Sequence, residues 1–230
     1  MSEEEELFTI TAKHLDSGMR GIPVGTCQTS YVDPLEGVHY VGYPVGDLAN
    51  MEEEDVVFLL LNKHLPTAEE SIAFRKELTH RAEEMPTGAV RVLESLTPGS
   101  GHPMDWLSVG IHTLGMMETT NNWKDDALNL IARMPRLMGL IFRIREGREE
   151  NIPSDDTSLS MDERFIRCLD LHDANTEKMK RIISTYLVLH MDHGGGNLST
   201  FAGKAIASSK ATVYSAMAGA MNALSGPLHG

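Results

Sequence analysis

Apolar positions recur at helical spacing along most of this chain, and the pattern becomes regular after the first fifty residues. Val56, Val57 and the leucines 59–61 form one apolar face. Because residues three and four positions apart share a face of a helix, this spacing predicts an amphipathic helix with one buried side. Thr67 and Glu70 then form a capping-box pattern, which predicts that a second helix begins there.

The same periodicity predicts a series of further helices, separated by prolines, glycines and polar stretches. Pro103 directly after His102 marks a helix entry, and Pro135 inside a long apolar pattern predicts a kink. A polar loop is expected over 146–160. The predicted helices span 71–84, 87–96, 103–117, 124–145, 161–171, 176–190 and 200–224.

The last predicted helix, 200–224, has an unusual composition. Ala, Gly and Ser fill thirteen of its twenty-five positions, and only Lys204 and Lys210 are charged. Because small side chains let two helix axes approach closely, we expect this segment to be buried among other helices. It is interpreted as a central core helix, as part of a dimer interface, or as both.

The segment 18–47 has a different pattern, rich in Gly, Pro, Thr, Val and Tyr. Residues 31–42 form two short extended segments around Pro34 and Gly37, a pairing that predicts a small hairpin. No other part of the chain has a strand pattern. The predicted fold class is therefore all-α with a small N-terminal β-hairpin.

Composition and charge narrow the class of protein. With 41% apolar residues in 230, the chain can bury a substantial core. The formal charge of -13 and the lack of a dense Lys/Arg cluster argue against nucleic acid as a partner. Two distant cysteines, an acidic start where a leader would be basic, and no membrane-length apolar run predict a cytoplasmic protein that does not associate with membranes.

Two histidine-bearing turns carry the candidate chemistry. The first runs from His190 to His193, continues through three glycines (194–196), and reaches Asn197 and Ser199. The second is Gly-Pro-Leu followed by His229. Two imidazoles held at a fixed separation suit proton transfer on a small polar substrate, and glycines before a helix N-terminus let the backbone approach a small dicarboxylate.

Each of these features also has an ordinary explanation. His190 and His193, with Asp192 between them, have metal-ligand side chains, but no Cys pair or Glu completes a set at recognisable spacing, so no metal is expected. The three glycines could merely end a helix. The remaining isolated histidines are expected to serve packing or to lie on the surface; examples are His14, His39, His80, His112 and His172.

Several motifs, taken in order, resemble the N-terminal part of citrate synthases, of the citrate and 2-methylcitrate synthase superfamily. The resemblance runs from about Gly18 and covers the first half to two-thirds of the family's usual length. It divides the chain into an acidic N-terminal segment, 1–17, and a partial large helical domain, 18–230. The matching motifs are 18–21 with 29–43, then 59–67, then 102–104, and finally 190–197 with 226–230.

The resemblance implies an acyltransferase that condenses acetyl-CoA with oxaloacetate, without a permanently bound cofactor. His229 matches the family's enol-stabilising histidine, and His193 matches the histidine that binds oxaloacetate. Ser199 matches a hydroxyl that orients the catalytic imidazole, and Asn197 is expected to shape the same pocket. Arg20 resembles a basic contact to the CoA phosphates.

The resemblance further implies that the base Asp, a second catalytic His, the carboxylate-binding arginines and most of the CoA site belong to segments that would follow residue 230. Because a base must lie within hydrogen-bond reach of the methyl proton, this chain alone is expected to be inactive. It is interpreted as a fragment, as half of a split enzyme completed by another chain, or as a noncatalytic helical partner. A homodimer is expected, and the choice between acetyl-CoA and propionyl-CoA stays open.

Overall fold

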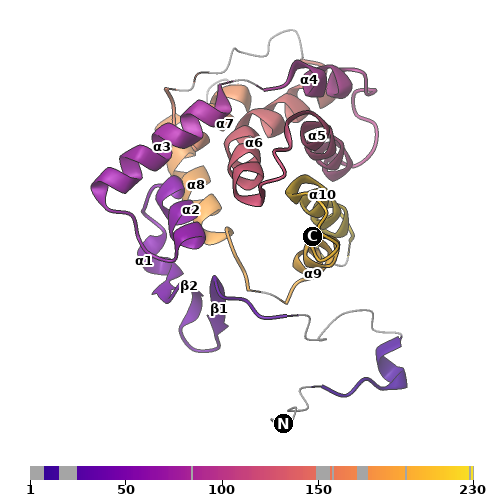
Figure 1. The fold of residues 1–230 in the computed structure, drawn as a ribbon. Helices are drawn as coiled ribbons and strands as arrows, with labels where there is room; N and C mark the ends of the chain where they lie inside the picture. The colour runs from indigo at the N-terminus through magenta and orange to yellow at the C-terminus, as the bar shows by residue number, and fades with distance from the viewer. Residues whose placement is uncertain are drawn as a thin grey trace.

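The computed structural model describes residues 8–15, 25–83, 85–148, 156, 158–169, 176–194, 196–227 and 229. These residues contain ten α-helices, a short 3-10 helix (η1, Ala12–Leu15) and one small antiparallel sheet. Figure 1 shows the helices gathered into one bundle, with the sheet at one edge and η1 apart from it. The predicted all-α class with a small N-terminal hairpin is confirmed.

The sheet begins as the predicted hairpin and gains a third strand. Asp33 shapes the turn, because its Oδ1 accepts hydrogen bonds from the backbone N–H groups of Leu35 (2.7 Å) and Glu36 (2.8 Å). Gly37 has a φ of 89°, which few residues other than glycine adopt. The elements of this region are β1 (Ser30–Asp33), β2 (Gly37–Tyr40), β3 (Tyr43–Pro44) and the short helix α1 (Val45–Leu48).

The next seven helices follow the apolar periodicity of the sequence closely. Thr67 accepts a hydrogen bond from the backbone of Glu70 and completes the predicted capping box, so this helix begins at residue 68, directly after its cap. His102 caps the helix that begins with Pro103. The bounds are α2 (Glu53–Asn62), α3 (Ala68–Ala82), α4 (Thr87–Glu94), α5 (Pro103–Glu118), α6 (Trp123–Arg145), α7 (Met161–Leu169) and α8 (Thr176–Leu189).

The predicted single helix over 200–224 is wrong, because the chain forms two helices there: α9 (Leu198–Ala207) and α10 (Val213–Leu224). Lys210, three residues after the end of α9, adopts a left-handed conformation with a φ of 64°, so the backbone leaves the helical path there. Thr212 then caps the second by accepting a hydrogen bond from the backbone of Ser215. The break contains neither Gly nor Pro, so the usual signals of a helix end are missing.

Close packing of α10 explains much of its small-residue content. A Cβ atom on Gly115 of α5 would lie 2.5 Å from Cβ of Tyr214, and one on Gly219 would lie 2.1 Å from Cδ1 of Ile206 in α9. Helix α10 therefore packs against both α5 and α9 with almost no space at these two contacts. Burial is uneven, since α10 contributes four buried residues whereas α9 contributes none.

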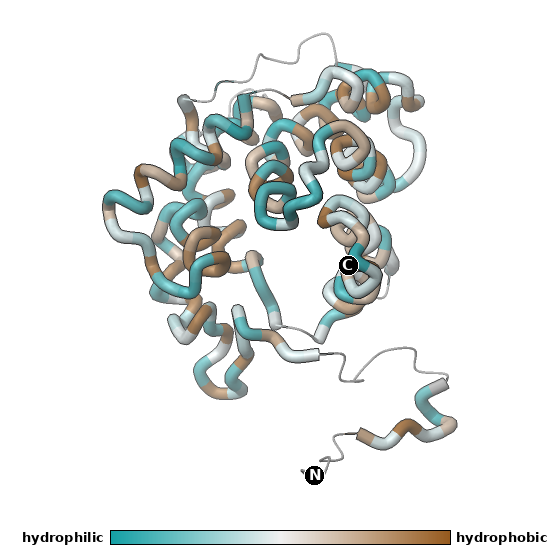
Figure 2. The backbone as a smooth tube through the Cα atoms, viewed as in Figure 1, coloured by the Kyte–Doolittle hydropathy of each residue, from teal (hydrophilic) through white to brown (hydrophobic). Residues whose placement is uncertain are grey.

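Two apolar clusters position the site. The larger one joins α4, α5, α6 and α10, and the smaller one joins the sheet, α1, α2 and α8 around the fully buried Tyr40 and Val188. Figure 2 shows brown and teal residues mixed along α2, α3, α5 and α6, as expected for helices that bury one face. Among the described residues, no helix combines the length and apolarity that crossing a membrane requires.

Candidate active site

The first turn of α9 holds the ring of His229. The backbone N–H of Ser199 donates a hydrogen bond to Nε2 of His229, with an N to N distance of 3.1 Å, and Oγ of Ser199 lies 3.0 Å from the same nitrogen. The backbone N–H of His229 donates to the carbonyl of Gly226 at 3.0 Å, which closes the turn after α10. After α10, the chain therefore comes back to the start of α9, where the imidazole of His229 is held.

Asn197 organises the same turn. It is the N-cap residue of α9, and its Oδ1 accepts hydrogen bonds from the backbone N–H of Thr200 (2.7 Å) and from the hydroxyl of Ser199 (2.8 Å). An N-cap side chain satisfies backbone donors that have no partner within the helix. Asn197, Ser199 and His229 thus form one connected group.

This group bears on which nitrogen of His229 carries a hydrogen. The backbone N–H of Ser199 points at Nε2, which favours the tautomer in which Nε2 accepts and the neutral ring carries its hydrogen on Nδ1. An imidazole held in this tautomer presents an N–H donor on its other side. Such a donor can stabilise an oxygen atom that gains negative charge during a reaction.

The loop that carries His193 is held by the N-terminal sheet region. The backbone N–H of Gly194 donates to Oγ of Ser30 at 2.6 Å and to Oδ1 of Asp192 at 3.0 Å. The hydroxyl of Thr29 donates to the other carboxylate oxygen of Asp192. Gly194 has a φ of 74°, so the sharp turn at this position requires glycine.

Tyr40 supports the loop from the core side. Its hydroxyl oxygen accepts a hydrogen bond from the backbone N–H of Asp192 at 3.3 Å, and its side chain is fully buried. Burial is the main reason that the pKa of Tyr40 lies above its usual value. The sequence alone did not predict that Thr29, Ser30 and Tyr40 support the loop of His193.

The segment 26–30 joins the two histidine-bearing parts. Nζ of Lys204 in α9 donates to the carbonyl of Thr26 at 3.1 Å, and Ser30, four residues later, contacts Gly194. Figure 1 shows the chain from α8 to α9 passing close to β1. The loop of His193 and the helix that holds His229 are therefore tied to one short stretch of chain.

His193 itself is exposed. Within the described residues, its side chain forms no hydrogen bond to Ser199 or His229. His190 is engaged elsewhere, because its ring stacks on Tyr186 with centroids 4.1 Å apart and its Nδ1 lies 2.8 Å from the Tyr186 carbonyl oxygen. These contacts do not gather the two histidines and Asp192 as a ligand set. Arg20, the expected CoA contact, lies outside the described residues, as does His172.

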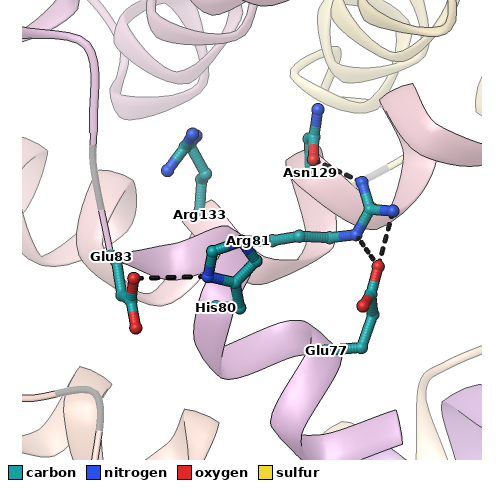
Figure 3. Close-up of a pocket in the computed structure, with 6 residues that line it drawn as sticks. All are labelled: Glu77, His80, Arg81, Glu83, Asn129 and Arg133. Carbon is teal, nitrogen blue, oxygen red and sulfur yellow. Dashed lines mark hydrogen bonds and ion pairs between the residues drawn. The ribbon is translucent and has the colours of Figure 1, made fainter.

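A separate cavity of about 530 Å³ lies between α3 and α6 (Figure 3). Arg81 crosses it and is already engaged, since it contacts Glu77 at 2.6 Å and Oδ1 of Asn129 at 2.7 Å. None of its lining residues belongs to the histidine site. They are Glu77, His80, Arg81, Glu83, Asn129 and Arg133.

Replacing Ser30 should loosen the His193 loop. In Ser30→Ala, the amide of Gly194 keeps only its bond to Asp192, and the loss of about 1 kcal/mol should speed its hydrogen exchange about fivefold. Exchange followed by NMR measures this effect. Ser209→Ala is the control, because that exposed hydroxyl bonds only to a nearby carbonyl, and equal exchange in both variants would contradict the assignment.

Comparisons with known proteins agree with this fold. The family described as "Citrate synthase, C-terminal domain" matches residues 18–230. Citrate synthase 5, mitochondrial, of Arabidopsis thaliana is 32% identical over a match that covers 96% of this chain and 51% of the relative. Probable citrate synthase, mitochondrial, of Leishmania braziliensis is 30% identical, with 93% and 50% covered.

The fold is also similar to those of solved citrate synthase structures. The crystal structure of citrate synthase from Pyrobaculum aerophilum has a TM-score of 0.80 at 26% identity and covers 91% of this chain and 55% of that chain. For the enzyme from Thermotoga maritima, the TM-score is 0.79, also at 26% identity. The chain spans about half the length of the curated relatives it matches.

The fold and the site together define a helical protein that holds a histidine at a helix N-terminus, and the two solved structures compared above, which share this fold, are citrate synthases. With a family match across residues 18–230, the chain belongs to the citrate synthase family.

The expected cytoplasmic location is contradicted by the same comparisons. Each of five curated relatives is named as a mitochondrial protein. The expectation depended on the two distant cysteines, the acidic start and the lack of a membrane-length apolar run.

Proposed function

We propose that this chain supplies the histidine-bearing half of a citrate-synthase-type acyltransferase, which condenses acetyl-CoA with oxaloacetate to give citrate and CoA. The observation that carries the proposal is the contact between Ser199 and His229, in which the backbone N–H of Ser199 points at Nε2 and turns Nδ1 to the other side of the ring. The family membership supports the reaction class. The substrates are those that the resemblance implies.

In the proposed reaction, Nδ1–H of His229 donates to the thioester oxygen of acetyl-CoA while a carboxylate removes a methyl proton. The donor stabilises the negative charge that develops on this oxygen, so the enol forms at a lower barrier. The enol carbon then bonds to the ketone carbon of oxaloacetate, while the C=O double bond opens and its oxygen takes up a proton. Water finally cleaves the citryl thioester and releases the CoA thiol.

The other residues have supporting roles in this proposal. His193 is exposed and binds oxaloacetate, and the loop contacts of Ser30 and Tyr40 hold it in place. Ser199 and Asn197 orient the ring of His229. Arg20 binds the CoA phosphates, a role that depends on the resemblance alone. No resident cofactor is required, because acetyl-CoA enters as substrate.

Assayed alone, the 230-residue polypeptide should release no CoA thiol from acetyl-CoA and oxaloacetate. The resemblance places the base Asp in a segment that these residues do not include, and without a base the methyl proton is not removed. Thiol release is measured with a chromogenic thiol reagent, with the Thermotoga maritima enzyme as the positive control. Turnover above the background rate would show that the chain contains its own base.

A binding role is the second proposal, and one face of α8 favours it. Ile182 and Tyr186, one turn apart, are 52% and 60% exposed, and Leu189 is 40% exposed. This surface suits a noncatalytic partner or one half of a split synthase. The chain is mixed with a full-length synthase, and the mass of the assembly is measured by light scattering. A binding partner changes this mass, whereas a mere fragment leaves it unchanged.

Three further points are proposals as well. The protein forms a homodimer, as the exposed Met116 and Met117 on α5 suggest. Residues 1–17 form an acidic segment outside a partial large domain at 18–230. The protein acts in mitochondria, as its named relatives do.

The choice of substrate is a separate question. Assays with propionyl-CoA beside acetyl-CoA test the alternative that the protein is a 2-methylcitrate synthase.

A further inference from the structure

Asp192, which precedes His193 in the sequence, makes hydrogen bonds to three separate parts of the chain. Oδ2 of its carboxylate accepts one from the hydroxyl of Thr29, 163 residues earlier. Oδ1 accepts one from the backbone N–H of Gly194 at 3.0 Å. The backbone N–H of Asp192 donates to the hydroxyl oxygen of Tyr40 at 3.3 Å. Both carboxylate oxygens and the amide of Asp192 therefore fasten the loop that carries His193.

The two distant partners of Asp192 are themselves held in place by the sheet. The carbonyl of Thr29 accepts a hydrogen bond from the backbone N–H of Val41 at 2.8 Å, directly after the end of β2. Tyr40 is the last residue of β2, is fully buried, and pairs with Ser30 of β1. Supporting groups position a site only when their own conformations are fixed. The sheet therefore gives Asp192 a rigid attachment.

The two carboxylate bonds have different effects. The bond from Gly194 is local, and an aspartate that bonds the backbone two residues later is a common turn former. The amide of Gly194 also donates to Oγ of Ser30 at 2.6 Å, so the turn does not depend on Asp192 alone. The bond from Thr29 joins the loop to a distant segment, and its charged acceptor makes it stronger than a neutral hydrogen bond. This long-range bond gives Asp192 a role beyond the turn.

The segment that contains Thr29 also reaches the helix that holds His229. Nζ of Lys204 in α9 donates to the carbonyl of Thr26 at 3.1 Å, and the first turn of α9 bonds to the ring of His229. Between these contacts, Sγ of Cys27 lies 3.3 Å from Oγ1 of Thr29. Asp192 is therefore connected through Thr29 to the part of the site that holds the other imidazole.

We propose that Asp192 is a positioning residue, and that its bond to Thr29 fixes where His193 lies relative to His229. The inference rests on the proposed function, in which His193 binds oxaloacetate and His229 acts on acetyl-CoA. Two bound reactants must be held within about 0.5 Å of the productive geometry. An aspartate that only shaped its own turn would leave this separation unset, whereas the bond to Thr29 sets it.

The variant Thr29→Val tests this role in the 230-residue chain. It removes the hydroxyl but leaves both hydrogen bonds of the Gly194 amide in place. Hydrogen exchange of that amide should nevertheless become about tenfold faster, because the carboxylate of Asp192 is no longer held. The order parameter of the same amide should fall from about 0.85 toward about 0.6, and the ring signals of His193 should shift. NMR measures all three effects.

Three further variants assign the effect to the bond itself. Thr29→Ser keeps the hydroxyl and should restore the parental exchange rate and ring signals. In Asp192→Asn, the amide nitrogen cannot accept a hydrogen bond, so one of the two carboxylate bonds is lost. Adding Thr29→Val to Asp192→Asn should then have little additional effect, because the two substitutions remove the same bond. Asp47→Asn, at an exposed position of α1, is the matched control for the change of charge and should behave as the parent does.

Two results would overturn the proposal. One is parental exchange of the Gly194 amide in Thr29→Val, and the other is strictly additive effects of Thr29→Val and Asp192→Asn. Exchange that becomes faster throughout the chain, with a matching loss of stability in denaturant, would likewise show a general structural role. The measurements use no substrate, so such results would remove the role of Asp192 alone. The proposed function is tested separately by substituting His229 in an active enzyme.

Discussion

Replacing His229 by Ala should lower kcat by about 10²- to 10³-fold in an enzyme that joins these 230 residues to the remaining half of a relative. The Thermotoga maritima citrate synthase is a suitable donor of that half, because its fold matches 93% of this chain. The substitution removes the Nδ1–H donor for the thioester oxygen. Steady-state release of CoA thiol measures the effect.

Two companion variants separate chemistry from folding. His112→Ala, at an exposed position of α5, should leave kcat unchanged. Ser199→Ala should lower kcat less than His229→Ala does, because the backbone N–H that fixes Nε2 remains. Full activity of His229→Ala would reject the assigned role of this residue.

Adding one methyl group to Gly115 should destabilise the fold by about 1–3 kcal/mol. The new Cβ would lie 2.5 Å from Cβ and 2.8 Å from Cγ of Tyr214. Tyr214 is 1% exposed, and its hydroxyl donates to Glu118 at 2.8 Å, so the ring cannot move aside cheaply. Helices α5 and α10 would have to separate.

Denaturant unfolding of Gly115→Ala measures this loss. Gly203→Ala is the matched control on α9, because the nearest atoms to its new Cβ lie at an ordinary 3.5 Å. Because alanine has a higher helix propensity than glycine, Gly203→Ala should leave the free energy of unfolding unchanged or raise it by up to about 1 kcal/mol. Equal stability of the two variants would show that α5 and α10 are less tightly packed than the structure indicates.

Local signals predicted the elements whose causes are local. The face of α2 follows from the spacing of Val56 and its neighbours, and the start of α3 follows from Thr67 and Glu70. The break between α9 and α10 was missed because it depends on a left-handed Lys210, and lysine gives no sequence signal for that conformation.

In the candidate site, too, the local motifs were recognised from the sequence, whereas the long-range contacts were not. The motifs that contain Ser199 and His229 were recognised through the family resemblance, and the structure places these two side chains in contact. The support of the His193 loop was not predicted, because Ser30 and Tyr40 lie more than 150 residues from it along the chain. Such long-range bonds leave no periodic pattern in the sequence.

The turn between α9 and α10 has a consequence for how the site forms. Because the two helices lie side by side and the chain reverses between them, the end of α10 returns to the beginning of α9 (Figure 1). The Ser199–His229 bond therefore closes a loop of only 30 residues. A loop this short closes at low entropic cost. The imidazole can therefore be preset by its own helical hairpin during early folding, before any distant part of an enzyme docks against it.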